Sequence, residues 1–204
     1  MMNEHEMARD LVQITDGTAD DLDALHARLA TAAQSESILD IAYRVVDSPV
    51  GALLIAATEL GLVRVAYASE GHDTVLQSLA DRISPRILLS PGRLETAARQ
   101  LDEYFAAERN EFSVPLDWRL SAGFRGTVLR QLPGIGYGHT ASYAAVAKLA
   151  GNPNAVRAVG TACATNPLPV VVPCHRVVRS DGALGGYLGG VEAKRILLTL
   201  ESAA

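Results

Sequence analysis

The chain has few cysteines, few aromatic residues and no long apolar run. Cysteine accounts for two of the 204 residues, and aromatic residues make up 5%. Cys163 and Cys174 are too few for a disulfide framework or for a zinc site with four protein ligands. No segment reaches the roughly 18 apolar residues that a membrane span needs. The polar, acidic start (1–6) does not have the pattern of a secretory signal, so a cytoplasmic protein is expected.

What the chain does contain is typical of a globular protein with an uneven charge distribution. Hydrophobic residues make up 49% and charged residues 20%, and the net charge is −5. Residues 1–118 contain nine Lys/Arg against 20 Asp/Glu, a balance of −11, whereas residues 119–204 contain nine against three, a balance of +6. A basic half beside an acidic half predicts a phosphate-facing surface on the C-terminal part.

The pattern of apolar residues predicts an α/β unit in the first half. Leu22, Leu25 and Leu29 have helical spacing, so residues 1–37 are interpreted as an N-terminal helical extension. Three short apolar runs separated by turn sequences then predict a meander of strands. The expected first domain, residues 38–118, contains strands at 41–46, 52–57 and 62–68, helices at 73–83 and 92–108, and a closing strand at 112–115.

The second expected domain, residues 119–204, is mainly helical. Helices are predicted at 121–132, 142–150 and 155–164, and a four-residue turn (151–154) separates the last two, which is the outline of a helix-turn-helix. Small residues dominate the last of these helices, and Arg157 is its single long polar side chain. Such a helix suits close approach to a nucleic-acid backbone or narrow groove. An alanine-rich packed helix explains the same residues equally well.

The segment 170–178 contains the residues best suited to chemistry. Cys174, His175 and Arg176 follow one another between β-branched residues. A cysteine reacts as the thiolate, and its ordinary pKa of about 8.5 leaves little of it ionised at neutral pH. His175 offers a base and Arg176 a positive charge. Cys163, in contrast, is expected to be a small buried hydrophobic residue.

A carboxylate is also expected, to hold the His175 ring in one tautomer. Asp181, Glu192 and Glu201 are the downstream candidates, and Glu201 is our choice. A Cys–His pair also occurs in thiol hydrolases, but their two residues are usually distant in sequence, because adjacent side chains point in different directions. Here the base is therefore expected to act through a water molecule.

At this point the sequence resembles a known family. The motif Pro173-Cys174-His175-Arg176-Val177 resembles the signature of the O6-alkylguanine-DNA alkyltransferases, also called methylated-DNA–protein-cysteine methyltransferases. Other segments match the family in order and spacing, so that the resemblance covers about 121–201. These are Ser142-Tyr143, Ala150-Gly151-Asn152-Pro153, Arg157-Ala158-Val159-Gly160, Asn166-Pro167 and Gly185-Gly186-Tyr187-Leu188-Gly189-Gly190. Residues 38–118 resemble the family's N-terminal domain with its ribonuclease-H-like sheet, whereas residues 1–37 match nothing.

The resemblance implies a single-use repair reaction on double-stranded DNA. Cys174 would accept the alkyl group of O6-alkylguanine, with O4-alkylthymine as a second candidate substrate, without a metal or cofactor. His175 would take the thiol proton through water, Glu201 would orient His175, and Tyr143 would donate a proton toward the leaving guanine. Asn166 would brace the turn before the cysteine loop. The base pocket would include Tyr187, Leu188, Gly189 and Val177.

The resemblance also assigns the DNA contacts. The helix at 155–164 would lie in the minor groove, where Ala155, Ala158 and Gly160 allow close approach, and Arg157 would fill the space of a base flipped out of the duplex. A monomer in solution is expected. The sequence departs from the family at two points. It lacks the cysteines for the N-terminal zinc site that some members have. It also has Leu188 at a pocket position where other members have smaller or hydroxylated residues.

Three alternatives have weaker support. An alkyltransferase-like damage sensor would lack the acceptor, yet Cys174 is present. A transcription regulator that reports its own methylation would need a second DNA-binding module. A cysteine hydrolase would need a distant histidine. The sequence leaves open which adducts are repaired, whether guanine or thymine is preferred, and whether binding on DNA is cooperative.

Overall fold

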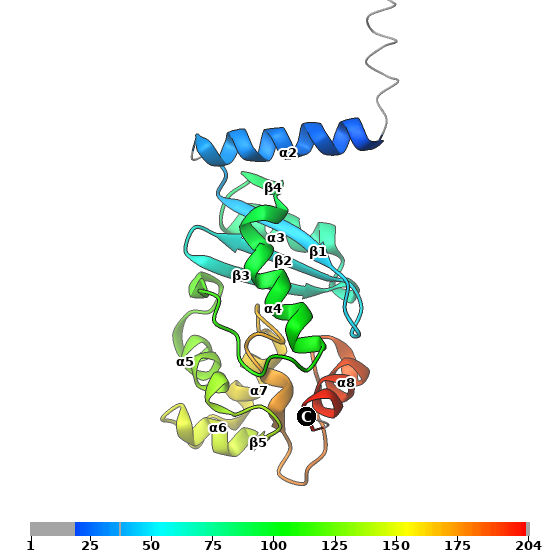
Figure 1. Ribbon diagram of the computed structural model, residues 1–204. Coiled ribbons are helices and arrows are strands. Elements are labelled where there is room, and N and C mark those ends of the chain that lie inside the picture. The colour runs from blue at the N-terminus through cyan, green and yellow to red at the C-terminus, as the bar shows by residue number, and fades with distance from the viewer. Residues whose placement is uncertain (1–18, 37, 203–204) are drawn as a thin grey trace, which may run out of the picture.

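The protein contains a small α/β unit followed by a helical unit (Figure 1). The computed structural model describes residues 19–36 and 38–202, so the polar start that argued against a secretory signal lies outside the described residues. Within these ranges no helix has the length and apolar character needed to cross a membrane. The α/β class expected from the sequence is confirmed.

The elements follow the predicted order closely. The first unit contains α2 (Ala19–Ser35), β1 (Ile41–Val46), β2 (Leu53–Thr58), β3 (Gly61–Tyr67), α3 (His72–Arg82), β4 (Ile87–Leu89) and α4 (Glu95–Phe105). The second unit contains α5 (Gly123–Gln131), β5 (Ala141–Ser142), α6 (Tyr143–Leu149), α7 (Val156–Ala164), β6 (Val177–Val178) and α8 (Gly190–Ser202).

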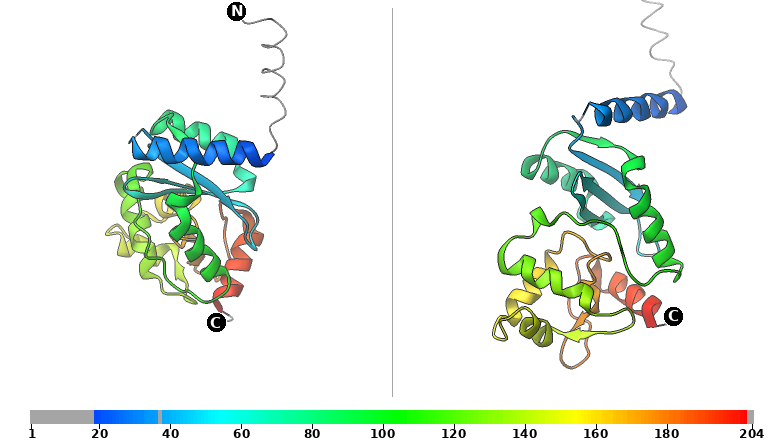
Figure 2. Two further views of the ribbon diagram at one scale, coloured as in Figure 1. Left: turned by 45° about the horizontal axis from the view of Figure 1, so that its top comes forward. Right: turned by 60° about the vertical axis from the view of Figure 1, so that its left-hand side comes forward.

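The four-stranded sheet has the order β3-β2-β1-β4. The first three strands form the predicted antiparallel meander, and β4 pairs with β1 in parallel. Because side chains alternate between the faces of a strand, Leu54 and Ala56 of β2 face α3, whereas Leu53 and Ile55 belong to the cluster on the side of α4. Figure 2 shows α3 and α4 on opposite sides of the sheet.

The fourth strand is not the one that the sequence predicted. Residues 112–115 make no strand; the chain makes only an isolated bridge there, between Leu62 and Leu116. Two features of the segment explain this. Pro115 has no N–H for a ladder, and the side-chain amide oxygen of Gln100 accepts the backbone N–H of Ser113 at 2.9 Å. The actual strand β4 is an apolar triplet between Pro85 and Pro91.

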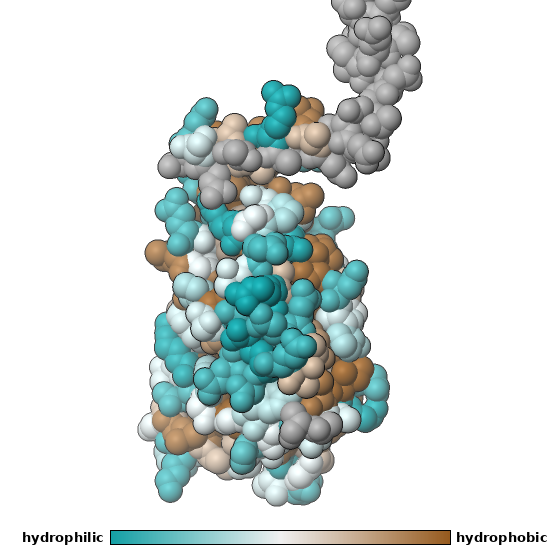
Figure 3. Space-filling model, viewed as in Figure 1, coloured by the Kyte–Doolittle hydropathy of each residue, from teal (hydrophilic) through white to brown (hydrophobic). Residues whose placement is uncertain are grey.

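Helix α4 joins the two units. Its buried residues Ala97, Ala98, Leu101 and Tyr104 have helical spacing and belong to one continuous apolar cluster, which includes residues of the sheet and of α5, α6, α7 and α8. The opposite side of α4 carries charged residues such as Arg99, and the molecule is mainly hydrophilic there (Figure 3). A single core thus fixes the second unit against the first.

Helices α5, α6 and α7 pack together in the second unit. Helix α6 begins at Tyr143 because Ser142 is its N-cap: the Ser142 hydroxyl accepts the backbone N–H of Ala145 at 3.1 Å, which satisfies a donor that the first helical turn leaves free. Residues 150–155 then lead directly into α7. Helix α2 lies beside β4, at the end of the molecule opposite α6 (Figures 1 and 2).

Candidate active site

Cys174 is buried in a tight turn, with 1% of its surface exposed. It begins the short 3₁₀ turn Cys174–Arg176, and its backbone N–H donates to the carbonyl of Val172 at 2.8 Å. The approach to this turn is strained, since Val170 has a φ of 70°, which is unusual for a β-branched residue. The sulfur therefore lies on a tightly packed, buried loop.

Asn166 fixes the position of the sulfur. Its side-chain amide nitrogen donates to Sγ of Cys174 at 3.1 Å and to the carbonyl of Val172 at 2.9 Å. The amide oxygen accepts the backbone N–H of Leu168 at 3.0 Å. Asn166 is fully buried, so these bonds satisfy groups that water cannot reach. The side chain thus ties the end of α7 to the cysteine loop.

The surroundings of Cys174 act on its pKa in opposite directions. Burial is the largest effect and raises the pKa of the thiol to about 11, because a charged sulfur is poorly solvated in the core. The hydrogen bond from Asn166 and the positive charge of Lys194 act to lower it. The resting site therefore holds a neutral thiol, with the amide of Asn166 already directed at the sulfur.

His175 and Glu201 form a buried pair. The distance from His175 Nε2 to Glu201 Oε1 is 2.8 Å, and both side chains are 1% exposed or less. Burial lowers the pKa of His175, although Glu201 acts to raise it. The neutral ring therefore donates its Nε2 proton to the carboxylate. Nδ1 has no hydrogen-bond partner among the described residues, and it is left as the basic nitrogen.

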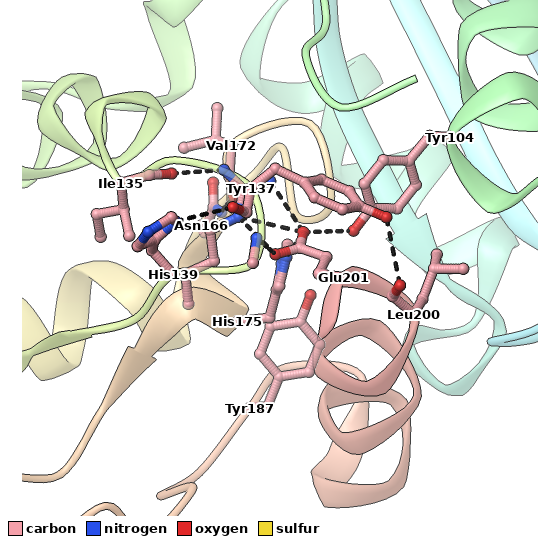
Figure 4. Close-up of polar contacts among 12 residues, drawn as sticks. Tyr104, Ile135, Tyr137, His139, Asn166, Val172, His175, Tyr187, Leu200 and Glu201 are labelled. Carbon is pink, nitrogen blue, oxygen red and sulfur yellow. Dashed lines mark hydrogen bonds and ion pairs between the residues drawn. The ribbon is translucent and has the colours of Figure 1, made fainter. Parts of the chain in front are cut away.

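The Glu201 carboxylate receives donors from several directions (Figure 4). Arg176 donates to both oxygens at 2.9 Å, the hydroxyl of Tyr104 donates at 2.7 Å, and the backbone N–H of Gly138 donates at 3.3 Å. Burial alone would raise the pKa of Glu201, but hydrogen bonds from His175 and Arg176 outweigh it and lower the pKa to about 2. Glu201 is therefore an anion at neutral pH, and it is the carboxylate chosen from the sequence.

Tyr143 lies close to the cysteine loop because two short strands pair. Strands β5 and β6 are parallel, with Ala141 opposite Val177, so the start of α6 is held beside the residues that follow Cys174. The hydroxyl of Tyr143 packs on Gly185, where an added Cβ would lie 3.1 Å from it. Burial raises the pKa of Tyr143, and the neighbouring thiols of Cys163 and Cys174 act in the same direction.

The predicted pocket residues are partly gathered at this place. Val177 is buried, and Tyr187 packs edge-on against His175, with ring centroids 6.4 Å apart. Leu188 faces elsewhere: with Asn166 it lines a cavity of about 440 Å³ whose other walls come largely from the first unit, including Arg64 and Val75. Cys174 does not line that cavity.

Two buried partners of this site were missed from the sequence. Tyr104 belongs to the first unit and looks like an ordinary core position of α4. Lys194 is fully buried, and its ammonium donates to the carbonyls of Val177, at 2.6 Å, and Leu184. Burial lowers the pKa of Lys194, and the nearby thiols oppose this shift. An isolated lysine on a helix gives no sequence signal of burial.

The outward side of α7 carries the residues predicted to meet DNA. Arg157 and Ala158 are exposed, and Ala155 and Gly160 are half-buried. A Cβ added at Gly160 would meet nothing within 4 Å. Val159, Ala162 and Cys163 form the inner side and are buried, as was expected for Cys163. Across residues 19–36 and 38–202, no group of three His, Cys, Asp or Glu side chains is arranged to hold a metal ion.

The architecture and the buried thiol define a two-unit protein with a cysteine-centred site, and sequence comparison identifies the class. Residues 41–118 match the family described as "6-O-methylguanine DNA methyltransferase, ribonuclease-like domain". Residues 123–203 match "6-O-methylguanine DNA methyltransferase, DNA binding domain". The chain therefore belongs to the 6-O-methylguanine DNA methyltransferase family, as the resemblance indicated.

Particular relatives agree with this assignment. The chain is 40% identical to a methylated-DNA–protein-cysteine methyltransferase of Mycolicibacterium paratuberculosis, over 79% of this chain and 92% of that protein. The constitutive enzyme of Bacillus subtilis is also 40% identical, over 78% and 94%. A crystal structure of the Mycobacterium tuberculosis OGT in complex with DNA is similar at a TM-score of 0.69 and 39% identity, over 79% and 93%.

Proposed function

We propose that this protein repairs DNA by transferring the alkyl group of O6-alkylguanine to Cys174, once per molecule. The observation that carries the proposal is the arrangement of the thiol: Asn166 donates to its sulfur, and the adjacent His175 is held by Glu201 with Nδ1 left basic. The reaction needs a nucleophile, a proton acceptor and a proton donor to the leaving base. Protein side chains supply all three, so no cofactor is proposed.

The proton path begins at the thiol. His175 follows Cys174 directly, and adjacent side chains diverge, so a bridging water is proposed between Sγ and Nδ1. As the proton moves to His175 the ring becomes positive, and the fixed anion Glu201 stabilises that charge. Arg176 and Tyr104 hold Glu201 in place for this role. The buried network thereby offsets the cost that burial imposes on the thiolate.

The alkyl carbon then passes from oxygen to sulfur. The thiolate forms a C–S bond as the C–O6 bond breaks, and the electron pair of the broken bond stays on the guanine. Tyr143 donates a proton to the leaving base and recovers one from His175. The products are guanine and an S-alkylcysteine. A thioether is stable in water, so the protein is consumed in the reaction.

The substrate base must leave the duplex to reach a buried sulfur, at a cost of a few kcal/mol in lost stacking. Helix α7 is proposed to lie in the minor groove, with Arg157 entering the stack in place of the extruded base. Its small exposed residues permit close approach. The M. tuberculosis relative has been solved in complex with DNA, which supports binding to DNA. The short connection between α6 and α7 supports our interpretation of this helix pair as a helix-turn-helix.

Some finer expectations remain predictions. These are the repair of O4-alkylthymine, the monomeric state, the cytoplasmic location and the domain boundaries at 37 and 118. The adduct range also depends on whether Leu188 turns toward the flipped base, since in the free protein it lines the cavity beside Asn166.

A mass measurement tests the proposal. The protein is incubated with duplex DNA that contains one O6-methylguanine, and the intact protein is weighed and then mapped by peptide. We expect a gain of one methyl group, located on Cys174. Cys174→Ala should gain nothing while still binding the duplex, and Cys163→Ala, the matched control, should react like the natural protein. Repeated turnover, or methylation at another residue, would contradict the proposal.

A further inference from the structure

Tyr67 brings the first unit into contact with the predicted base pocket. It is the last residue of β3, lies on the side of the sheet that faces the second unit, and is 2% exposed. A leucine or phenylalanine would fill such a core position without burying a hydroxyl. Burying a hydroxyl is costly unless it has a hydrogen-bond partner, so the partner of Tyr67 indicates what the residue does.

That partner is Tyr187. The two hydroxyl oxygens are 2.8 Å apart, and the rings meet edge to face with centroids separated by 5.9 Å. Tyr187 in turn packs edge-on against the ring of His175, and its hydroxyl is among the groups that oppose the effect of burial on the pKa of Cys174. The oxygen of Tyr187 can accept from Tyr67, and this leaves the proton of Tyr187 available for the sulfur. Hydrogen bonds in such a chain strengthen one another.

The ring of Tyr67 has a second contact, at Gly189. A Cβ placed on Gly189 would lie 2.6 Å from the ring, a distance that real Cβ atoms essentially never show. The backbone of the pocket segment is thus pressed directly on the face of Tyr67. A side chain from the first unit therefore sets both the orientation of the Tyr187 hydroxyl and the position of the backbone at Gly189.

We propose that Tyr67 is a positioning residue for alkyl transfer, which orients the Tyr187 hydroxyl through its own and fixes the pocket backbone at Gly189 with its ring. The inference rests on the proposed function, because it takes residues 187–189 as the wall beside the alkylated base. It adds a residue of the ribonuclease-like domain to a site whose other predicted members all lie in the second unit.

The hydroxyl of Tyr67 should influence the pH dependence of the reaction. Several titratable side chains lie near Cys174, and removing one hydrogen-bond donor should change the pKa of its thiol while the other groups stay in place. They are Tyr67 on β3, Tyr143 on α6, Cys163 on α7, Lys194 on α8, and His175 and Tyr187 in the loops. Without the hydroxyl of Tyr67, the Tyr187 proton is less firmly directed at the sulfur, so the pKa of Cys174 should rise.

The test measures single-turnover alkylation by free O6-benzylguanine across a range of pH. Tyr67→Phe keeps the ring and removes the hydroxyl. We expect its maximal rate to fall about three- to tenfold at neutral pH, the range for loss of one hydrogen bond, with the half-saturating concentration little changed. The rising limb of its pH profile should move to higher pH. Tyr43→Phe, a tyrosine of β1 in the same unit, is the matched control and should react normally.

A double-mutant cycle separates the bond from general effects on the core. Tyr187→Phe should also slow the reaction, and adding Tyr67→Phe to it should cost nothing more. Independent, multiplying losses would overturn the claim that the two hydroxyls act together. So would a Tyr67→Phe protein with the natural rate and pH profile.

The ring contact has its own test. Gly189→Ala should severely slow alkylation, and Tyr67→Ala in the same chain should restore part of the rate, since it removes the clash. Absence of any rescue in a folded double variant would overturn the contact role. If the natural protein itself gains no alkyl group, the proposed function fails; if it gains one and Tyr67→Phe behaves identically, only this inference fails.

Discussion

Glu201 shows how one buried charge can organise a reactive residue. Moving a carboxylate out of water costs several kcal/mol, and that cost is recovered only when donors satisfy its oxygens. Here His175, Arg176, Tyr104 and the backbone of Gly138 all donate to it. Because these donors come from three segments, the cysteine turn, α4 and the loop before β5, the carboxylate also fixes where the segments meet. Its chemical role and its structural role cannot be separated.

Replacing Glu201 should therefore affect both stability and reaction. Glu201→Gln leaves Arg176 buried without its anion, and we expect a loss of about 3–5 kcal/mol in the free energy of unfolding, the range for a broken buried pair. Urea denaturation of the two proteins measures this difference. Alkyl transfer should slow as well, since the positive His175 loses its counter-charge. A variant with natural stability and rate would show that the network carries neither role.

The low pKa of Glu201 also predicts how stability changes with acid. Its pKa lies near 2 in the folded protein and near 4.5 ordinarily. The unfolded chain therefore takes up a proton at higher pH than the folded one, and the stabilisation is complete above about 4.5 and is lost as the pH falls toward 2. Unfolding free energies at a series of pH values should show this slope. The Glu201→Gln protein should show a shallower slope.

Asn166 supports a prediction that concerns the sulfur alone. Asn166→Ala removes three buried hydrogen bonds. The carbonyl of Val172 keeps the N–H of Cys174 as a partner, but the backbone N–H of Leu168 loses its acceptor, at about 1–3 kcal/mol for a group left unpaired. Melting experiments should show that loss. Asn166→Asp keeps the size of the side chain but would bring an acceptor or a negative charge to the thiol, and it should slow alkylation more than its effect on stability explains.

At the scale of elements, most of the fold could be predicted from apolar spacing and turn residues. The meander, helices α3 and α4 and the helices of the second unit appear within a few residues of their predicted bounds. The strand predicted at 112–115 does not form, because Pro115 lacks an N–H and the side chain of Gln100 takes the backbone N–H of Ser113. Strand β4 was not predicted, because a run of three apolar residues between prolines is too short to be recognised as a strand.

Helix α7 gives an element-scale prediction. Arg157→Ala should reduce repair of O6-methylguanine in duplex DNA by about ten- to a hundredfold, because stacking lost on base flipping is worth a few kcal/mol and would go uncompensated. Reaction with free O6-benzylguanine should stay near the natural rate. Arg99→Ala, an exposed arginine on α4, is the control and should leave both reactions unchanged. Equal losses on duplex and free base would contradict the insertion of Arg157.

At the scale of the whole molecule, sequence located the site but not its full environment. Cys174, His175 and Arg176 are adjacent, so their proximity needs no fold. Glu201 was one choice among three carboxylates, and only the packing of α8 against the cysteine turn decides it. Tyr67 and Tyr104 could not have been predicted, since their roles depend on the docking of two units, which no local pattern encodes.

The charge asymmetry leads to a prediction for DNA binding. The second half of the chain has a balance of +6 within a protein of net charge −5. Binding should therefore release counterions, and affinity for duplex DNA should fall steeply with salt, linearly on a logarithmic plot. Fluorescence anisotropy at several salt concentrations gives the slope. A flat dependence would show that phosphate contacts contribute little and that the basic half serves another purpose.

The hydrogen bond from Tyr104 to Glu201 has a consequence for recombination between genes of this family. The two halves of this chain look like modules that recombination could exchange with those of relatives. Yet the hydroxyl that completes the carboxylate's surroundings is encoded in one module and the carboxylate in the other. A hybrid protein whose first half came from a relative without that tyrosine would fold with one donor missing around Glu201. Tyr104 and Glu201 should therefore be inherited together, and a compatible first half is part of what makes the second half work.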